Sequence, residues 1–319
     1  MTLPMRTACF ALLLLAATAQ AQYPEKPIRF LVGFSAGSLT DLSARTLSGV
    51  ASKYLKQQIV VTNLPGAAGA LAMGELARSP QDGLSVALMT SSYKSLVVHQ
   101  QKPAFDVNDL KTLMGYAEFR QLLFSKSDAP YSTIEELIAY GKKNPGVIKF
   151  GHSGVGTSIH LQGLHFFRAA GVDATDVPFK GSGDYINAVL GGHLPTAIVD
   201  VAGVLAHARA GSVRPLLTFT DRRPAELPNL PTAREKGFPG LDVFSPQVLV
   251  MIRQGTPADR ARILHDGFKR ATEDPDFLKG FQEIGIKAGY IPPEIADENI
   301  AKASAAAIPV LKELNLLAR

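Results

Sequence analysis

The sequence predicts an α/β protein of two domains, each a mainly parallel sheet flanked by helices. Short apolar runs such as residues 28–32 suit strands buried on both faces, as in a parallel sheet covered by helices. Glycine and proline separate these runs from segments with apolar residues at helical spacing. The chain has 319 residues, which is long for a single core and favours two domains.

Residues 1–21 have the pattern of a cleaved secretion signal. Arg6 gives a positively charged start, residues 8–17 form a short apolar stretch, and Ala19 and Ala21 fit a cleavage site. The apolar stretch is too short to cross a bilayer. We expect cleavage near Ala21 and export of a mature chain that contains no cysteine and hence no disulfide.

Composition and charge argue against nucleic acid as a partner. The formal net charge is +5, and about +4 without Arg6, which favours anionic small molecules only mildly. The basic residues are scattered rather than clustered with aromatic residues. We therefore expect a small-molecule ligand and no nucleic-acid binding.

The first predicted unit is an anion-binding loop between a strand and a helix. The strand at residues 28–32 leads into a loop of small residues and then into a helix over residues 41–55. The first N–H groups of a helix have no intrahelical partner, and the helix dipole adds partial positive charge there. The candidate ligand-binding residues of this loop are Phe34, Ser35, Ala36, Gly37 and Ser38.

Two further strands are predicted in the first domain, at residues 58–62 and 84–89, with a helix over residues 67–78 between them. The strand at 84–89 ends in Thr90 and Ser91, which either cap a helix or donate hydrogen bonds to a ligand. Ligands of open parallel sheets bind beyond the carboxyl ends of the strands. Thr90 and Ser91 are therefore candidate ligand-binding residues.

The same strand, loop and helix pattern returns in the second half of the chain. A strand at residues 147–150 leads into a loop of glycine and hydroxyl residues and then into a helix over residues 161–169. We expect this loop to face the first one across a cleft, which makes Ser153, Gly156, Thr157 and Ser158 candidates. The elements that follow are strands at 176–179, 196–200 and 213–220, a helix over 184–190, and helices within 257–319.

The chain is expected to cross between the domains twice. Residues 114–125 are extended and lead into the second domain, and residues 244–253 return the chain to the first. We therefore assign residues 22–121 with 249–319 to domain 1 and residues 122–248 to domain 2.

Four more residues near the expected cleft are candidates for ligand binding. Arg120 could clamp a carboxylate with two hydrogen bonds or form an ion pair between the domains. Asp200 ends a buried strand, where an acid needs a partner, and it either binds a ligand hydroxyl or amine or caps the following segment. Phe179 and Gly181 lie in the loop after the strand at 176–179.

The histidines do not predict a metal site. His152, His160, His165 and His193 include no i,i+4 pair, and no cysteine accompanies them. We therefore expect no metal and no cofactor. His160 either contacts a ligand or packs beneath the loop, and its position beyond the first N–H groups of the helix favours packing.

Ten motifs recur in the order known from one family, and together they cover essentially the whole mature chain. They are Phe34-x-x-Gly37-x-x-x-Asp41, Asn63-x-Pro65-Gly66-x-x-Gly69, Asp82-Gly83, Asn144-Pro145-Gly146, Gly151-x-Ser153-Gly154-x-Gly156-Thr157-Ser158-x-His160, Pro178-Phe179-Lys180-Gly181, Leu190-Gly191-Gly192-His193, Leu230-Pro231-Thr232, Gly237-Phe238-Pro239-Gly240 and Gly255-Thr256-Pro257. With them the chain resembles the Bug/TctC family, the periplasmic solute-binding proteins of tripartite tricarboxylate transporters.

The resemblance implies a fold and a function. It implies a two-domain Venus flytrap with the ligand in the interdomain cleft, where loop N–H groups, neutral side chains and waters hold a small carboxylate. The ligand would be an aliphatic di- or tricarboxylate or an aromatic acid. The implied location is the periplasm, the implied partners are membrane permease subunits, and we expect a monomer.

Two other functions are open to the same sequence. The stretch at residues 33–37 fits the hydrolase motif G-x-S-x-G, in which Ser35 would be the nucleophile of a periplasmic serine esterase. It follows the first strand of the mature chain, so no upstream element supplies an oxyanion hole, and we expect no enzymatic activity. A ligand sensor for a membrane receptor would use the same binding chemistry as a transport protein.

Overall fold

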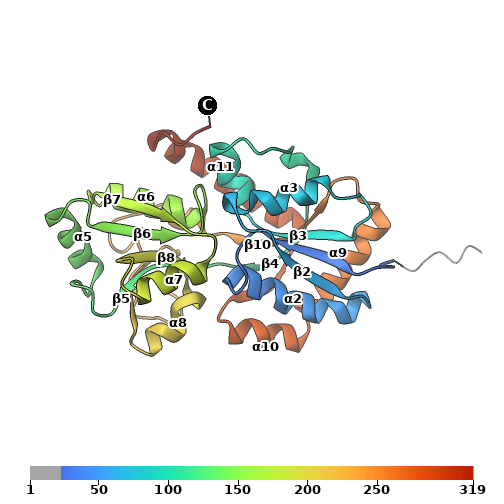
Figure 1. Cartoon of the computed structure of the whole chain (residues 1–319), viewed down its shortest axis with the longest axis horizontal. Coiled ribbons are helices and arrows are strands. Elements are labelled where there is room, and N and C mark those ends of the chain that lie inside the picture. The colour runs from blue at the N-terminus through green and yellow to red at the C-terminus, as the bar shows by residue number, and fades with distance from the viewer. Residues whose placement is uncertain (1–22, 319) are drawn as a thin grey trace, which may run out of the picture.

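The computed structural model describes residues 23–318, and the predicted secretion signal with its cleavage point near Ala21 lies outside these residues. Two sheets lie side by side, and helices flank each of them (Figure 1). The predicted α/β class with two sheet-based units is confirmed. We call the six-stranded sheet and its helices the first lobe, and the five-stranded sheet and its helices the second lobe.

The sheet of the first lobe is mixed, with four strands in one direction and two in the other. Its strand order is β11 (Lys287–Ile291), β4 (Leu110–Glu118), β10 (Gln247–Arg253), β3 (Ser85–Thr90), β1 (Ile28–Val32) and β2 (Ile59–Asn63). β1 is parallel to β2 and β3. β10 is antiparallel to both β3 and β4, so β4 has the direction of β1–β3, and β11 is antiparallel to β4.

The sheet of the second lobe has one reversed strand. Its order is β7 (Ala174–Pro178), β6 (Ile148–His152), β8 (Thr196–Asp200), β5 (Gln121–Lys126) and β9 (Val213–Thr218). β6 is parallel to β7 and β8, whereas β5 is antiparallel to β8 and β9. Most strands of each sheet therefore share one direction, as predicted, although several ladders are antiparallel.

The strands β5 and β10 are antiparallel to their neighbours because the chain enters them from the other lobe. The chain leaves β4 through Phe119 and Arg120 into β5, and it returns along residues 219–246 into β10. Each of these strands begins at the edge where β8 or β3 ends, so it must run the opposite way. The division of the chain into two domains near residues 121 and 248 stays a prediction.

The helices cover both faces of the first sheet. α2 (Leu39–Leu55), α9 (Ala258–Thr272) and α10 (Pro275–Glu283) pack on one face, and α3 (Ala70–Arg78) and α11 (Pro293–Glu313) on the other (Figure 1). Successive side chains of a strand point to opposite faces, so Phe30 packs with the α2 and α9 cluster and Leu31 with the α3 cluster. This explains why β1 is a continuous apolar run.

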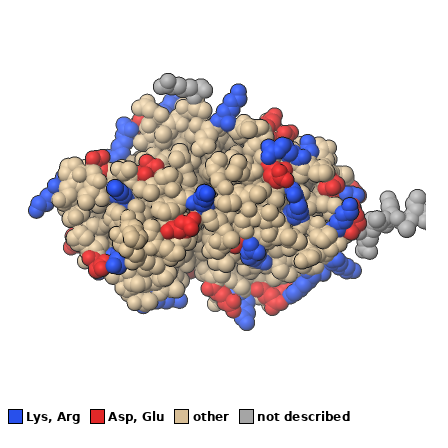
Figure 2. Space-filling view, in the orientation of Figure 1, with Lys and Arg blue, Asp and Glu red and all other residues tan. Residues whose placement is uncertain are grey.

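The second sheet is flanked by α5 (Ile134–Lys143), α6 (Ser158–Ala169), α7 (Ser182–Leu190) and α8 (Val201–Arg209). No helix within residues 23–318 combines the length and the apolar character needed to cross a bilayer. On the face in Figure 2, acidic and basic side chains are interspersed, and no continuous basic patch lies on that face.

Four helices, α2, α3, α6 and α7, begin at other residues than predicted, and the differences in α2, α6 and α7 bear on the cleft. α2 begins at Leu39 because the Ser38 side chain accepts a hydrogen bond from the N–H of Asp41 (3.3 Å). α6 begins at Ser158, directly after the glycine loop. α3 begins only at Ala70, since Ala67 and Ala68 have positive φ and form an irregular turn instead.

The two lobes touch across the cleft. The N–H of Ser35 donates to the carbonyl of Lys180 (3.1 Å), and the side-chain amide of Gln100 donates to the carbonyl of Gly156 (3.2 Å). Near the end of α11, the guanidinium of Arg168 in the second lobe donates to the carbonyl of Glu313 (3.0 Å). The structure is therefore a closed arrangement of the lobes.

Candidate ligand-binding site

A small cavity lies between the lobes, and the N-terminal ends of several helices border it, among them α2 and α6. Its volume is about 50 Å³, which is space for roughly four water molecules at ~10–15 Å³ each. α2 contributes its first residues from the first lobe, and α6 contributes its first residues from the second. The cavity is lined by Phe34, Leu39, Thr40, Thr90, Ser92, Phe119, Gln121, Ser153, Thr157, Ser158, Ile159, Ser182, Tyr185, Val199, Asp200 and Pro246.

The N-terminus of α6 presents three N–H groups without an acceptor. Thr157 is the N-cap residue, but its hydroxyl donates to the carbonyl of Gly154 (2.7 Å) and does not cap the helix. The N–H groups of Ser158, Ile159 and His160 therefore have no hydrogen-bond partner in the part of the chain that the structure describes. Together with the helix dipole they form a site for an anion.

The N-terminus of α2 is more fully occupied. The N–H of Leu39 donates to the hydroxyl of Ser182 in the second lobe (3.1 Å), and the Ser38 side chain accepts from Asp41. Within residues 23–318, the N–H of Thr40 is the group of this first turn that lacks a partner. The first lobe thus offers fewer donors than the second.

The predicted first loop lies mostly outside the cavity lining. Phe34 lines the cavity, whereas Ser35, Ala36, Gly37 and Ser38 do not. The N–H groups of three of these residues are occupied: Ser35 donates to Lys180, Ser38 to the carbonyl of Ser35 (3.2 Å), and Gly37 to the carboxylate of Asp41 (2.8 Å).

Asp41 lies in the first turn of α2 and holds this loop against that helix. Its carboxylate also accepts hydrogen bonds from Arg45 (2.9 Å) and Asn63 (2.8 Å), and both hold the pKa of the carboxyl below its usual range, although burial opposes them. Asp41 is thus the acidic residue in the first turn of α2. Whether the loop also reaches a ligand stays a prediction.

The second lobe supplies Ser153, Thr157, Ser158 and Asp200 to the cavity lining. Gly156 instead contacts the first lobe, where a Cβ would lie 3.2 Å from the side-chain amide of Gln100. A Cβ on Gly181 would lie 3.0 Å from the Cβ of Ser35 and 3.2 Å from that of Ser38. Glycine at these two positions therefore permits the close approach of the lobes.

The remaining candidates divide between the cavity and other places. Thr90 lines the cavity, and its hydroxyl is hydrogen-bonded to that of Ser92 (2.9 Å). The hydroxyl of Ser91 accepts from the N–H of Gln247 (3.0 Å) and lies outside the lining. Phe179 borders a separate hollow near Ser153.

Arg120 forms an ion pair and does not line the cavity. Its guanidinium donates two hydrogen bonds to Glu226 (both 2.9 Å) and one to the carbonyl of Gly285 (3.3 Å). Of the two roles open in the sequence, the ion pair between chain segments is the one present. The cavity lining accordingly includes no lysine, arginine or histidine.

Asp200 is a buried acid that lines the cavity. Its carboxylate accepts hydrogen bonds from the N–H of Ala202 (2.9 Å), as the N-cap of α8, and from the N–H of Arg120. Burial raises the pKa of its carboxyl to about 7, although these two N–H groups oppose the shift. Both roles proposed from the sequence are thus compatible: Asp200 caps a helix and faces the cavity.

Several lining residues had no clear signal in the sequence. Gln121 is paired in register with Asp200 on the neighbouring strand, so both side chains lie on the same sheet face. Its side-chain amide donates to the hydroxyl of Ser158 (2.8 Å). Ser182 is the first residue of α7 and precedes the predicted helix start at residue 184, whereas Tyr185 lies within the predicted helix.

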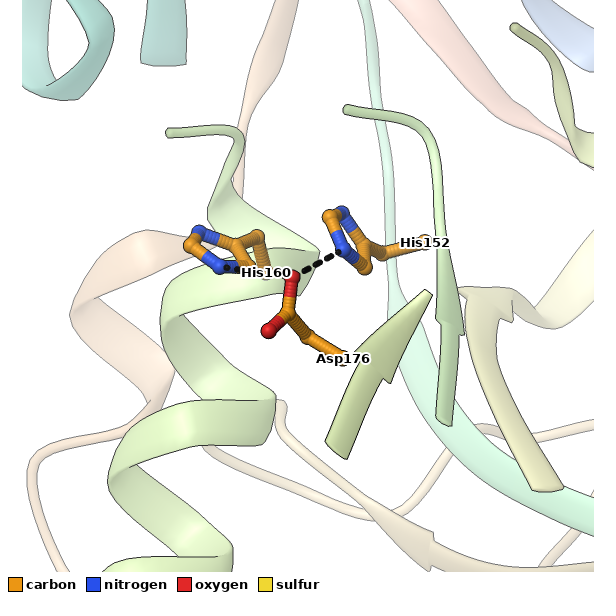
Figure 3. Close-up of side chains that lie close together, drawn as sticks. All are labelled: His152, His160 and Asp176. Atoms are coloured by element: carbon orange, nitrogen blue, oxygen red, sulfur yellow. Dashed lines mark hydrogen bonds and ion pairs between the residues drawn. The ribbon is translucent and has the colours of Figure 1, made fainter. Parts of the chain in front are cut away.

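A cluster of two histidines and one aspartate lies beneath the glycine loop, although the spacing of the histidines predicted no metal site (Figure 3). Nε2 of His152 lies 3.2 Å from Oδ2 of Asp176, and Nε2 of His160 lies 3.5 Å from the same oxygen. The three residues come from β6, α6 and β7, so no sequence spacing could reveal the cluster. The prediction that His160 packs beneath the loop is confirmed, since only 3% of it is exposed.

The hydrogen bonds of this cluster support the loop and do not present a metal site. The N–H of Gly156 donates to Nδ1 of His160 (3.1 Å), so the ring proton of His160 is on Nε2 and points to Asp176. A metal would need a lone pair on that nitrogen. Burial, then the neighbouring His152, lowers the pKa of His160 to about 4, and burial lowers that of His152.

The geometry around Ser35 is unlike that of a hydrolase nucleophile. Its hydroxyl donates to the carboxylate of Asp184 (3.4 Å) across the lobe contact. No histidine within residues 23–318 is hydrogen-bonded to it. A serine nucleophile needs such a base to accept its proton.

The comparisons with known proteins agree with one another. The model of the family described as "Tripartite tricarboxylate transporter family receptor" matches residues 43–316. A Cupriavidus necator protein described as "UPF0065 protein in gbd 5'region" is 32% identical over 286 residues, which are 89% of this chain and 86% of that protein. Protein BugT of Bordetella pertussis is 29% identical, over 86% of this chain and 87% of that protein.

Solved structures show the same fold. The structure of the periplasmic binding protein BugD superposes with a TM-score of 0.87 at 25% identity, over 93% of this chain and 100% of that one. An R. palustris protein solved with adipate gives a TM-score of 0.85 at 25% identity, over 92% of this chain and 99% of that one. The similarity extends through both lobes.

Proposed function

The chain belongs to the tripartite tricarboxylate transporter receptor family, and from this premise we propose that it captures a small carboxylate between its lobes for transport. The observation that carries the proposal is the N-terminus of α6. Its first three N–H groups have no acceptor among residues 23–318, and Ser158 and Ile159, which carry two of them, line the cavity. Buried N–H groups without partners are costly, and a carboxylate would supply acceptors for them.

The donors are sufficient for useful affinity. Three N–H groups come from α6, and Thr40 adds one from α2. A hydrogen bond to a charged group contributes about 1.5–3 kcal/mol. Micromolar affinity corresponds to about −8 kcal/mol, which lies within the roughly 6–12 kcal/mol that four such bonds contribute.

The remaining parts of the proposal concern location and partners. We propose that the mature chain acts in the periplasm as a monomer and delivers its ligand to membrane permease subunits. The family description and the periplasmic neighbour BugD support this placement. Deletion of the gene should abolish uptake of the ligand; if uptake persists while a transcriptional or motile response is lost, the sensor function replaces transport.

Titration calorimetry on the purified chain tests the binding function. The panel contains aliphatic acids, adipate among them, and aromatic acids, with the matching amides as neutral controls. At least one carboxylate should bind with micromolar affinity or better, and its amide should bind at least tenfold more weakly. Equal binding of acid and amide would overturn the proposal that the site recognises a carboxylate.

A further inference from the structure

The cavity contains one acidic side chain that an anion-binding site does not need. Asp200 is only 6% exposed and lines the same cavity as the N-terminus of α6. No cationic side chain lines this cavity to balance it, since Arg120 is engaged by Glu226. The other ionisable residue of the lining is Tyr185.

The acid and the N–H groups of α6 lie on the two sides of Gln121. Asp200 is the register partner of Gln121, and the side-chain amide of Gln121 reaches the hydroxyl of Ser158, the first residue of α6. A ligand that fills the cavity therefore contacts N–H donors at one end and the carboxyl of Asp200 near the other. The small volume of about 50 Å³ keeps these two ends close together.

Asp200 retains the capacity to accept another hydrogen bond. Each of its carboxylate oxygens accepts one backbone N–H, from Ala202 and from Arg120, and each oxygen has a second lone pair. A second ligand carboxylate at this position would place two like charges in a cavity without a counter-charge. A hydroxyl or an ammonium group would instead donate to Asp200.

We propose that the ligand is a small carboxylate that also carries a hydroxyl or ammonium donor, with α6 binding its carboxylate and Asp200 accepting from its donor. This inference rests on the proposed carboxylate-binding function. Asp200 is then the residue that determines specificity, in addition to capping α8.

Calorimetry with ligands that differ in a single group tests the inference. Propionate, lactate and alanine differ only in hydrogen, hydroxyl or ammonium at C2, and succinate, malate and aspartate form the four-carbon counterpart. The titrations are run at pH 8, where Asp200 is mostly ionised, since its pKa is about 7. In at least one series the donor-bearing acid should bind at least tenfold more tightly than the unsubstituted acid, and the comparison of hydroxyl with ammonium identifies the donor.

Asp200→Asn should reduce this preference to less than about threefold. Asparagine still caps a helix, so the fold should be kept. The matched control is Asp274→Asn, because Asp274 is also a buried N-cap aspartate, in α10, and lies outside the cavity. This control should keep the full preference.

The outcomes distinguish failure of this inference from failure of the proposed carboxylate-binding function. If the chain binds the unsubstituted acids or adipate as tightly as every donor-bearing acid, the inference is overturned and the carboxylate function stands. If Asp200→Asn keeps the preference, Asp200 is not its cause. Failure to bind any carboxylate would overturn both.

Discussion

Replacing Ser158 by proline removes one N–H group from the site with little other change. Ser158 is the first helical residue of α6, where proline is well tolerated because its missing N–H has no intrahelical partner. The preceding residue, Thr157, has φ −66° and ψ 162°, the extended conformation that a residue before proline adopts. Ser158→Pro should therefore leave the helix intact.

The expected loss follows from the hydrogen bond that is removed. A charge-assisted N–H bond is worth about 1.5–3 kcal/mol, so affinity should fall roughly 10- to 100-fold. Ser158→Ala serves as the reference, since it loses only the contact with the Gln121 amide (2.8 Å) and keeps the N–H. The alanine variant should lose only a few fold, about 0.5–1.5 kcal/mol.

The assay is titration calorimetry with the tightest carboxylate of the panel, together with thermal unfolding of each variant. Ala258→Pro is the control for proline itself, because Ala258 is the exposed first residue of α9 and lies outside the cavity. It should bind like the wild type. Equal affinities of Ser158→Pro and Ser158→Ala would refute the role given to the α6 N–H groups.

Four further results are expected. Gly181→Ala should weaken binding by about tenfold or more, because its Cβ would press on Ser35 at 3.0 Å and hinder closure; unchanged affinity would show that the lobes close differently. Arg120→Gln should affect diacids and monoacids equally, since Arg120 pairs with Glu226 outside the cavity, and a selective loss for diacids in calorimetry would place Arg120 on the ligand. The pKa of His160 is about 4 in the folded state and 6.5 when unfolded, so the unfolded state binds more protons between these values and stability should fall by up to about 3 kcal/mol as pH drops from 6.5 to 4. Chemical unfolding of His160→Gln should show a smaller slope, to which His152 still contributes because burial lowers its pKa as well. A slope equal to the wild type's would contradict the assignment. A serine-reactive phosphonate should not label Ser35, and stoichiometric labelling that is lost in Ser35→Ala would revive the esterase function.

The sequence predicted the site best where the chemistry is local. The loop before α6 follows a buried strand and precedes a helix, and its Ser153, Thr157 and Ser158 all line the cavity. A strand, a glycine loop and a helix start are specified by neighbouring residues, so a pattern in the sequence suffices to find them.

The equivalent loop before α2 could not be placed in the same way. The carboxylate of Asp41 accepts a hydrogen bond from the N–H of Gly37, and it also accepts one from the side chain of Asn63, 22 residues away. The N–H of Ser35 is hydrogen-bonded to the carbonyl of Lys180 in the other lobe. Such contacts depend on tertiary structure, which the pattern of a single loop does not contain.

The charged residues show the same limit. For Arg120 the sequence left two roles open, and its partner Glu226 is 106 residues away. The cluster of His152, His160 and Asp176 joins two strands and a helix, and its spacing matches no metal-binding motif. In both cases the partner could be identified only after the chain had folded.

The most direct measurement is a titration of the ¹⁵N-labelled chain with its tightest carboxylate, followed by NMR. The amide signals of Ser158, Ile159 and His160 should move strongly downfield and saturate with the dissociation constant found by calorimetry. The amide of Ala258, at the exposed start of α9, should stay in place. If the three α6 signals do not move while the carboxylate binds, the ligand lies elsewhere and the account is contradicted.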